Sequence, residues 1–370
     1  MKFTCEKYLL DAAVATAGRA APPKSPVPAL EGILVEATQN VTLTGYDLKR
    51  GIFTTFAADV SIPGSVVLPA RIFGEIVRKL PDGIVTVVSD DNNMVNISCG
   101  NADYNIMGND SEDYPELPSM DYANSLTLTQ ERLGRMINET NFAVSDNESR
   151  PVYTGALFEV ENDVLTVVAI DGYRLALRRE QIDKCDSESM RFIVPGTALS
   201  DMEKICAGGE GDVRVTVGSK HISFTVGDTV LITRRLEGEF LNYRKTVPSQ
   251  FPIQVKAKRT ELIRCAERVS LIIDDRAKNP LRCRFGNGEL KISCATPLGR
   301  AEDTCALDGN GGDTLVGFNN SYLLQALKAA PADEVTVNLT NGNSPCVLLP
   351  CDGSDAFLYM ILPVRLHSGE

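Results

Sequence analysis

The chain has 370 residues, of which 43% are hydrophobic and 23% charged, and this composition excludes a disordered or collagen-like chain. At roughly 100 to 200 residues per domain, the length predicts two or three globular domains. Charged residues, Gly or Pro interrupt every apolar stretch before it reaches the ~18 to 20 residues of a bilayer span, so we expect no membrane protein. Glu6, Lys7 and Asp11 break the apolar stretch near the N-terminus, which favours a first helix over a signal peptide.

The residues that usually carry catalysis or bind metals are sparse. The ten cysteines form no CxxC pair, so we expect buried thiols in a reducing cytoplasm, with no disulfide framework, metal or cofactor. The chain has two histidines, His221 and His367, and this leaves little for general-base catalysis. The GxxxxGK[ST], GxSxG, HExxH and GxGxxG motifs are absent from the sequence. Nothing in the sequence therefore argues for an enzyme.

The first third predicts two units in which a strand runs into a helix. A strand from residue 3 leads to a helix over 6–19, with the apolar stripe Leu10, Ala13, Val14 and Ala17. A strand at 67–69 leads to a helix over 70–80, with the stripe Phe73, Ile76, Val77 and Leu80. A β-type run follows at 85–88.

The same order of elements then recurs twice along the chain. The middle third predicts helices over 130–143 and 197–207 and a strand at 213–217, and the last third predicts helices over 258–273 and 321–330 and a strand at 335–339. A repeat of about 125 residues is too long for a solenoid unit. The sequence therefore predicts three similar α+β domains, over 1–122, 123–248 and 249–370.

The charge distribution qualifies the acidic net charge. A net charge of −12 argues at first against a nucleic-acid partner, because Lys and Arg supply most of the affinity for phosphate. The six predicted helices, however, contain 13 bases and 9 acids, whereas the rest of the chain contains 24 bases and 40 acids. Either these bases are simply good helix formers on a solvated face, or the helices line one surface that faces an anion.

Four segments, spread from end to end, resemble the bacterial sliding clamp, the β subunit of DNA polymerase III. They are MKFT at 1–4, LTGYDL at 43–48, AIDGYRLA at 169–176 and MILPVRL at 360–366. The resemblance implies the DNA clamp fold, with two helices packed on antiparallel sheets in each domain, and a head-to-tail homodimer that forms a ring around double-stranded DNA. Such a ring would resolve the conflict with the net charge, because a topological link needs only weak, sequence-independent attraction to phosphate.

The resemblance also implies a hydrophobic cleft between the second and third domains. In the family, this cleft binds a short peptide from the DNA polymerase III alpha subunit, the clamp loader or repair proteins. The positions carried over are Tyr153, Ile170, Gly172, Tyr173, Arg174, Leu175, Leu241, Asn319, Tyr322, Pro345, Ile361, Leu362, Pro363, Val364, Arg365 and Leu366. Leu241 stands where the family usually has Pro, and Lys278 where one well-known form has Phe, so the peptide preference stays open. Taken singly, such apolar residues are also typical of an ordinary core.

Ring closure and DNA contact are implied at further positions. An edge strand of the first domain around Tyr104 and Ile106 is expected to meet an edge strand of the third domain that runs from Arg300 to Cys305. Ile272 and Ile273 would pack against the neighbouring copy, or else belong to an ordinary core. Lys24 and Arg71 resemble basic positions of the family that contact DNA, although either is equally compatible with a solvated surface charge.

Two alternatives from other classes remain open. An enzyme could use paired carboxylates such as Asp274 and Asp275, but paired acids after a helix are usually solvated. A non-catalytic repeat scaffold could bind peptides alone, without DNA.

Overall fold

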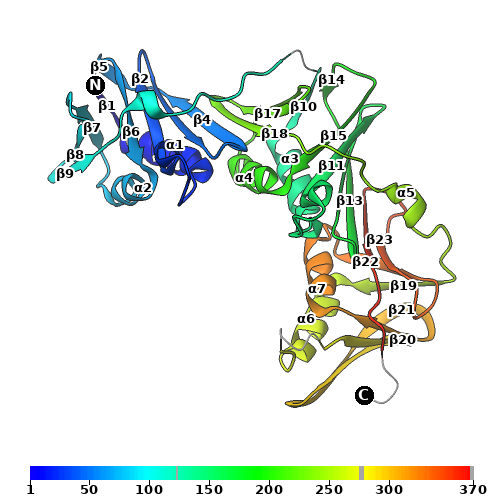
Figure 1. Cartoon of the computed structure of the whole chain (residues 1–370). Helices are drawn as coiled ribbons and strands as arrows, with labels where there is room; N and C mark the ends of the chain where they lie inside the picture. Colours follow the sequence, from blue (N-terminus) through cyan, green and yellow to red (C-terminus); the bar gives the residue numbers. More distant parts are fainter. Residues whose placement is uncertain (122–123, 275–278, 367–370) are drawn as a thin grey trace. The chain divides into compact units, whose positions relative to one another are not determined.

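The computed structural model describes residues 1–121, 124–274 and 279–366, and the chain forms two compact units (Figure 1). One unit comprises Met1–Gly134, Asp183–Ser187 and Ser200–Arg235, and the other comprises Arg135–Ile182, Glu188–Leu199 and Leu236–Glu370. Each unit therefore combines one end of the chain with part of the middle third. Within the described residues, no helix combines the length and the apolar character that crossing a membrane requires.

The first unit contains two antiparallel sheets. Five strands have the order β5-β1-β7-β8-β9, with bounds Asp59–Ile62, Lys2–Glu6, Ile84–Ser89, Met94–Cys99 and Ala102–Met107. Nine strands have the order β14-β10-β16-β17-β18-β4-β3-β2-β6, with bounds Lys184–Cys185, Asn124–Thr129, Asp212–Val217, His221–Val226, Thr229–Arg234, Arg50–Phe56, Val41–Tyr46, Gly32–Ala37 and Gly64–Pro69. The pairing of β18 with β4, in which Val230 lies opposite Phe53, joins strands of the middle and first thirds.

The second unit is built on one antiparallel sheet of ten strands. Their order is β15-β11-β12-β13-β24-β23-β22-β19-β21-β20, with bounds Ser189–Pro195, Gly155–Glu161, Val164–Ile170, Arg174–Gln181, Phe357–Ile361, Cys346–Pro350, Glu334–Leu339, Ile253–Lys258, Gly299–Phe318 and Leu281–Thr296. β13 pairs with β24, where Leu175 lies opposite Met360, and this pairing joins the middle and last thirds. The sheets thus run without a break across the expected domain boundaries.

The helices confirm the predicted repeat. The described residues contain α1 Lys7–Ala17, α2 Ala70–Lys79, α3 Gln130–Asn138, α4 Gly196–Cys206, α5 Tyr243–Thr246, α6 Arg259–Ser270 and α7 Asn320–Ala329. Short 3-10 turns cover Gly18–Ala20, Pro28–Glu31, Ser111–Asp113, Asn141–Ala143 and Pro151–Thr154. All the α-helices except the single-turn α5 begin within two residues of the end of a strand, namely β1, β6, β10, β15, β19 and β21.

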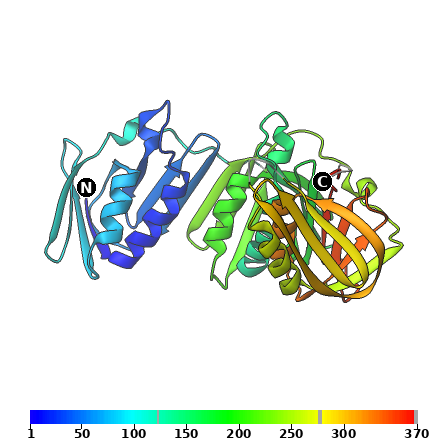
Figure 2. The ribbon, with the colours of Figure 1, turned by 90° about the horizontal axis from the view of Figure 1, so that it is seen from below.

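The predicted apolar stripes form the cores. α1 and α2 lie side by side (Figure 2), and their stripes are buried in one cluster that also contains Phe3 and Leu68. The stripes of α6 and α7 are likewise buried, at Leu262, Cys265, Ala266 and Val269 and at Leu323, Ala326 and Leu327. Burying one face of each helix is what i, i+3, i+4 spacing requires.

The prediction of where the third helix ends was wrong. We expected a helix over 130–143, but α3 ends at Asn138 and a separate 3-10 turn follows at Asn141–Ala143. The buried Thr140 hydroxyl donates to the carbonyl oxygen of Met136 at 2.7 Å. Ser and Thr hydroxyls that bond to nearby backbone groups in this way compete with the regular hydrogen bonds of a helix.

Candidate functional site

The candidate site lies in the second unit, where the turn between β12 and β13 meets the chain that follows β24. The backbone N–H of Leu362 donates to the carbonyl oxygen of Tyr173 at 2.8 Å. Two residues on, the N–H of Val364 donates to the carbonyl oxygen of Gly317 at 2.8 Å. These bonds hold the C-terminal tail, defined here as residues 362–366, against the middle third at one end and against β21 at the other.

A hollow of about 670 Å³ opens beside this tail. It is lined by Asn343, Pro345, Leu362, Pro363, Val364, Arg365 and Leu366. All but Asn343 were expected in the cleft. Gly317, which was not among the predicted site residues, lets the tail approach β21, because a Cβ there would lie 2.6 Å from the Val364 oxygen and 2.7 Å from Leu366 Cδ2.

The segment AIDGYRLA forms a tight turn that presents an aromatic side chain. Asp171 Oδ1 accepts from the backbone N–H groups of Tyr173 at 2.8 Å and Arg174 at 3.0 Å. Gly172 adopts φ +95°, a conformation that favours glycine. The turn leaves Tyr173 63% exposed, whereas Arg174, the next residue, is 8% exposed.

Arg174 lies at the centre of a polar and aromatic cluster. Its guanidinium donates to Asp171 Oδ2 at 2.9 Å, to the carbonyl oxygen of Phe142 at 2.5 Å and to Gln325 Oε1 at 2.6 Å. The guanidinium carbon also lies 4.4 Å from the centre of the Tyr322 ring, a cation–π contact. Burial raises the pKa of Tyr322, and the Asp171 carboxylate adds to this rise while Arg174 opposes it.

Two aromatic rings, one exposed and one half-buried, stack beside the start of the tail and are called the aromatic wall here. Tyr173 and Tyr322 stack with ring centres 6.2 Å apart and planes 25° apart. Asn319 caps α7, accepting through Oδ1 from the N–H of Tyr322 at 3.2 Å, and so fixes the start of the helix that carries this ring.

Several of the other predicted residues are core residues of the second unit and do not line the hollow. Ile170 and Leu175 are buried in a cluster with Phe240, Val347 and Met360, against which Tyr153 packs. Ile361 is wholly buried within β24, so it belongs to the sheet rather than to an open surface. Leu241 is 36% exposed. Lys278 lies outside the described residues.

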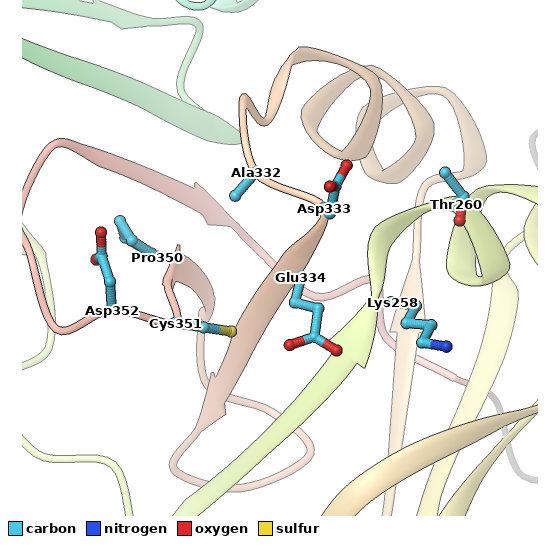
Figure 3. A pocket seen from close by; sticks show the side chains of 8 residues that line it. All are labelled: Lys258, Thr260, Ala332, Asp333, Glu334, Pro350, Cys351 and Asp352. Atoms are coloured by element: carbon cyan, nitrogen blue, oxygen red, sulfur yellow. The ribbon is translucent and has the colours of Figure 1, made fainter.

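A second hollow, of about 500 Å³, lies at the ends of β19, β22 and β23. Figure 3 shows its lining, which comprises Lys258, Thr260, Ala332, Asp333, Glu334, Pro350, Cys351 and Asp352. Lys258 and Glu334 lie opposite each other on paired strands, and the Thr336 hydroxyl lies 3.4 Å from the Cys351 sulfur. Most of these side chains are solvent-exposed, and three of them are carboxylates, so the hollow does not resemble an anion site.

The residues expected at the ring seam lie on two strand edges. Tyr104 and Ile106 lie on β9, the outermost strand of the five-stranded sheet. Arg300 and Cys305 lie in the first part of β21, which pairs with β20 on one side. Among the described strands, β19 pairs with β21 at a single position, Lys256 opposite Asp308, so residues 299–306 have one open side. Ile272 and Ile273 follow α6 and are half-buried.

The two expected DNA contacts are both exposed, but many helix bases have acidic partners. Lys24 is exposed in the loop before β2, and the Arg71 side chain is 87% exposed with its Nε 3.8 Å from Glu75. Five further helix bases form ion pairs with acidic residues, namely Lys7–Asp11, Arg132–Asp183, Arg135–Glu180, Arg268–Asp303 and Lys328–Glu267. Part of the basic excess counted from the sequence is therefore neutralised locally.

Comparison with known proteins identifies the family. Residues 1–118, 127–242 and 244–365 match the N-terminal, central and C-terminal domains of the DNA polymerase III beta subunit. The chain belongs to the beta sliding clamp family. Beta sliding clamps of Staphylococcus epidermidis and Staphylococcus aureus are each 32% identical to it, over 99% of this chain and 100% of the relative. The crystal structure of the DNA polymerase sliding clamp from Bacillus subtilis is 27% identical and superposes with a TM-score of 0.93, covering 99% of this chain and 100% of the other. The expected three-domain clamp fold is thereby confirmed.

Proposed function

We propose that two copies of this DNA sliding clamp close head to tail into a ring around duplex DNA and tether the replicative polymerase to it. The family match, which covers nearly the whole chain in three consecutive domains, is the observation that carries this proposal. We place the domain boundaries near residues 123 and 249. The partners proposed for the ring are the DNA polymerase III alpha subunit, the clamp loader and repair proteins that carry clamp-binding peptides.

Ring closure is proposed to join β9 of one copy to the first part of β21 of the other. An unpaired strand edge is a template for pairing with another chain, and a closed dimer would cover one such edge at each end of both copies. In this arrangement Tyr104 and Ile106 would face the stretch from Arg300 to Cys305. Ile272 and Ile273 would pack against the neighbouring copy.

Contact with DNA is proposed to be weak and independent of sequence. With a net charge of −12, the chain is poorly suited to tight phosphate binding in bulk solution. A ring needs no tight binding, because DNA is held by the closed chain itself. Lys24 and Arg71, both exposed, are the proposed phosphate contacts.

The hollow beside the C-terminal tail is the proposed peptide site. The apolar tail residues that line it, the stacked rings of Tyr173 and Tyr322 beside the start of the tail and the few polar groups suit capture of a short peptide.

The proposed role of the chain is not enzymatic. Of the two acids considered for catalysis, Asp274 is solvent-exposed and Asp275 lies outside the described residues.

Retention on circular DNA tests the proposal. The chain is loaded onto a nicked plasmid by its clamp loader, and the complex is separated from free protein by gel filtration. We expect co-elution that survives salt concentrations sufficient to abolish binding to a short linear duplex, and release when the plasmid is linearised. If the chain binds polymerase peptides but is never retained on the circle, the peptide-only scaffold is favoured.

A further inference from the structure

We propose that Gln325 is a positioning residue of the peptide cleft: it holds the Arg174 guanidinium against Tyr322 and so fixes the aromatic wall. This inference rests on the proposed function of the cleft. It adds a residue that lies on α7 and that neither the apolar pattern nor the resemblance to the family singles out.

Gln325 and Tyr322 share one side of α7. Residues three apart on a helix are neighbours on its surface, and both of these side chains contact Arg174. Gln325 Oε1 accepts from Arg174 Nη1 at 2.6 Å, while its Nε2 donates to the Ser321 hydroxyl at 2.9 Å. The Ser321 bond and the Arg174 bond require the same orientation of the amide, because a carboxamide oxygen accepts and its nitrogen donates.

The bond to Gln325 differs from the other two polar contacts of the guanidinium. Asp171 and Phe142, which accept from Nε and Nη2, both belong to the middle third of the chain. Gln325 belongs to the last third, and among the described hydrogen bonds of this guanidinium it is the one that reaches α7. It therefore ties the turn that carries Tyr173 to the helix that carries Tyr322.

Loss of this acceptor would leave a nearly buried charge with an unmade bond. Arg174 is 8% exposed whereas Gln325 is exposed, so with leucine at 325 Nη1 would lose its protein acceptor and the guanidinium would shift towards the open side of α7 to meet water. Such a movement would break the 4.4 Å contact with the Tyr322 ring and loosen its stack with Tyr173. A wall that must be ordered when the peptide arrives binds more weakly than one that is already ordered.

The test measures binding of a fluorescein-labelled peptide from the clamp-binding segment of the cognate DNA polymerase III alpha subunit. Gln325→Leu is expected to weaken binding about three- to tenfold, the usual effect of losing one hydrogen bond at a site of this kind. Gln325→Glu keeps an acceptor for Arg174 and is expected to restore near-parental affinity. Lys328→Met, on the next turn of α7, removes a surface ion pair with Glu267 and serves as the matched control without effect on binding.

A double-mutant cycle separates positioning from a general structural role. If Gln325 acts through Arg174, then Gln325→Leu has no further effect on affinity in an Arg174→Met background. Equal losses in both backgrounds, or parental affinity of Gln325→Leu, would overturn the inference. Melting temperature and retention on nicked circles are measured for every variant, so that misfolding is recognised. Failure of the parent chain to bind the peptide would instead overturn the cleft assignment itself, and this inference with it.

Discussion

At the scale of single residues, Gly45 sets how closely the end of α1 approaches β3. It lies within the segment LTGYDL, opposite Ile52 on β4. A Cβ built at this position would lie 2.0 Å from the carbonyl oxygen of Ala17, which is backbone and has little room to move. The glycine is therefore required by packing, and its φ does not place it in the left-handed region.

Replacement of Gly45 by Ala is expected to lower the free energy of unfolding by about 3 kcal/mol, as overpacking of a tight site does. Urea unfolding followed by circular dichroism measures the change. Gly74→Ala in α2 is the control, because its Cβ would make only an ordinary contact, 3.7 Å from Val14 Cγ1. Alanine also has the higher helix propensity, so this control should be neutral or slightly stabilising. Equal unfolding midpoints for the two variants would contradict the packing argument.

Glu139 is a buried carboxylate whose protonation depends on its surroundings. It is 4% exposed, and its Oε2 lies 2.9 Å from Arg178 Nε. Burial raises its pKa from 4.5 to about 7; the nearby Arg178 and Arg135 oppose this rise, and Glu180 adds to it. The folded chain therefore keeps this proton at a pH where the unfolded chain has already released it.

This difference predicts how stability varies with pH. Between about pH 4.5 and pH 7 the folded state binds more protons at Glu139 than the unfolded state does, so the contribution of Glu139 to stability falls as pH rises. Glu139→Gln cannot lose a proton and lacks this fall. We expect the melting temperature of the variant, relative to the parent, to rise from pH 5 to pH 8. A difference that stays constant across this range would show that Glu139 titrates normally.

At the scale of elements, the end of the chain divides into a structural strand and a tail. β24 pairs with both β13 and β23, and its residues Met360 and Ile361 are 2% and 0% exposed. Beyond Ile361 the chain leaves the sheet and lines the hollow of the candidate site. A truncation that tests the cleft must therefore spare β24, because removing Met360 and Ile361 would open the core of the second unit.

Deletion of Pro363–Glu370 is expected to weaken polymerase-peptide binding by more than about tenfold, since apolar anchors at such sites typically contribute ~2 kcal/mol or more. The dimer and the melting temperature should change little. Fluorescence polarisation measures the affinity. Removal of His367–Glu370 alone is the control and should leave binding intact, because the family pattern ends at Leu366. Parental affinity of the longer deletion would remove the tail from the site.

The sequence predicts those elements whose hydrophobic pattern lies within a short stretch of chain. The stripes of α1, α2, α6 and α7 follow from helical spacing within a dozen residues, and they are buried as expected. The pairings of β18 with β4 and of β13 with β24 bring together residues far apart in the chain, and no local pattern predicts them. The same holds for Gly317 and Gln325. Their roles exist only because the tail and Arg174 arrive from distant segments.

At the scale of the whole molecule, the proposed ring rests on surfaces that a single chain leaves uncovered. β9 is the outer strand of the five-stranded sheet, and on it Tyr104 is 38% and Met107 57% exposed. In the last third, Leu271, which follows α6, and Leu298, in the turn between β20 and β21, are 84% and 80% exposed. Large apolar side chains at unpaired strand edges favour association with another chain.

Replacing Ile272 and Ile273 together by Ala should shift the dimer towards monomer. Both are half-buried within one chain, so truncation removes less of the protomer's own core than it would at a fully buried site. If the neighbouring copy covers the rest of these side chains, the loss of apolar contact is roughly 3 kcal/mol, or about a hundredfold in the dimer Kd. Analytical ultracentrifugation over a dilution series measures this shift. Ile62→Ala, on the opposite edge strand β5 and 53% exposed, is the control that should leave the dimer unchanged. A dimer as stable as the parent's, with the melting temperature unchanged, would place the seam elsewhere.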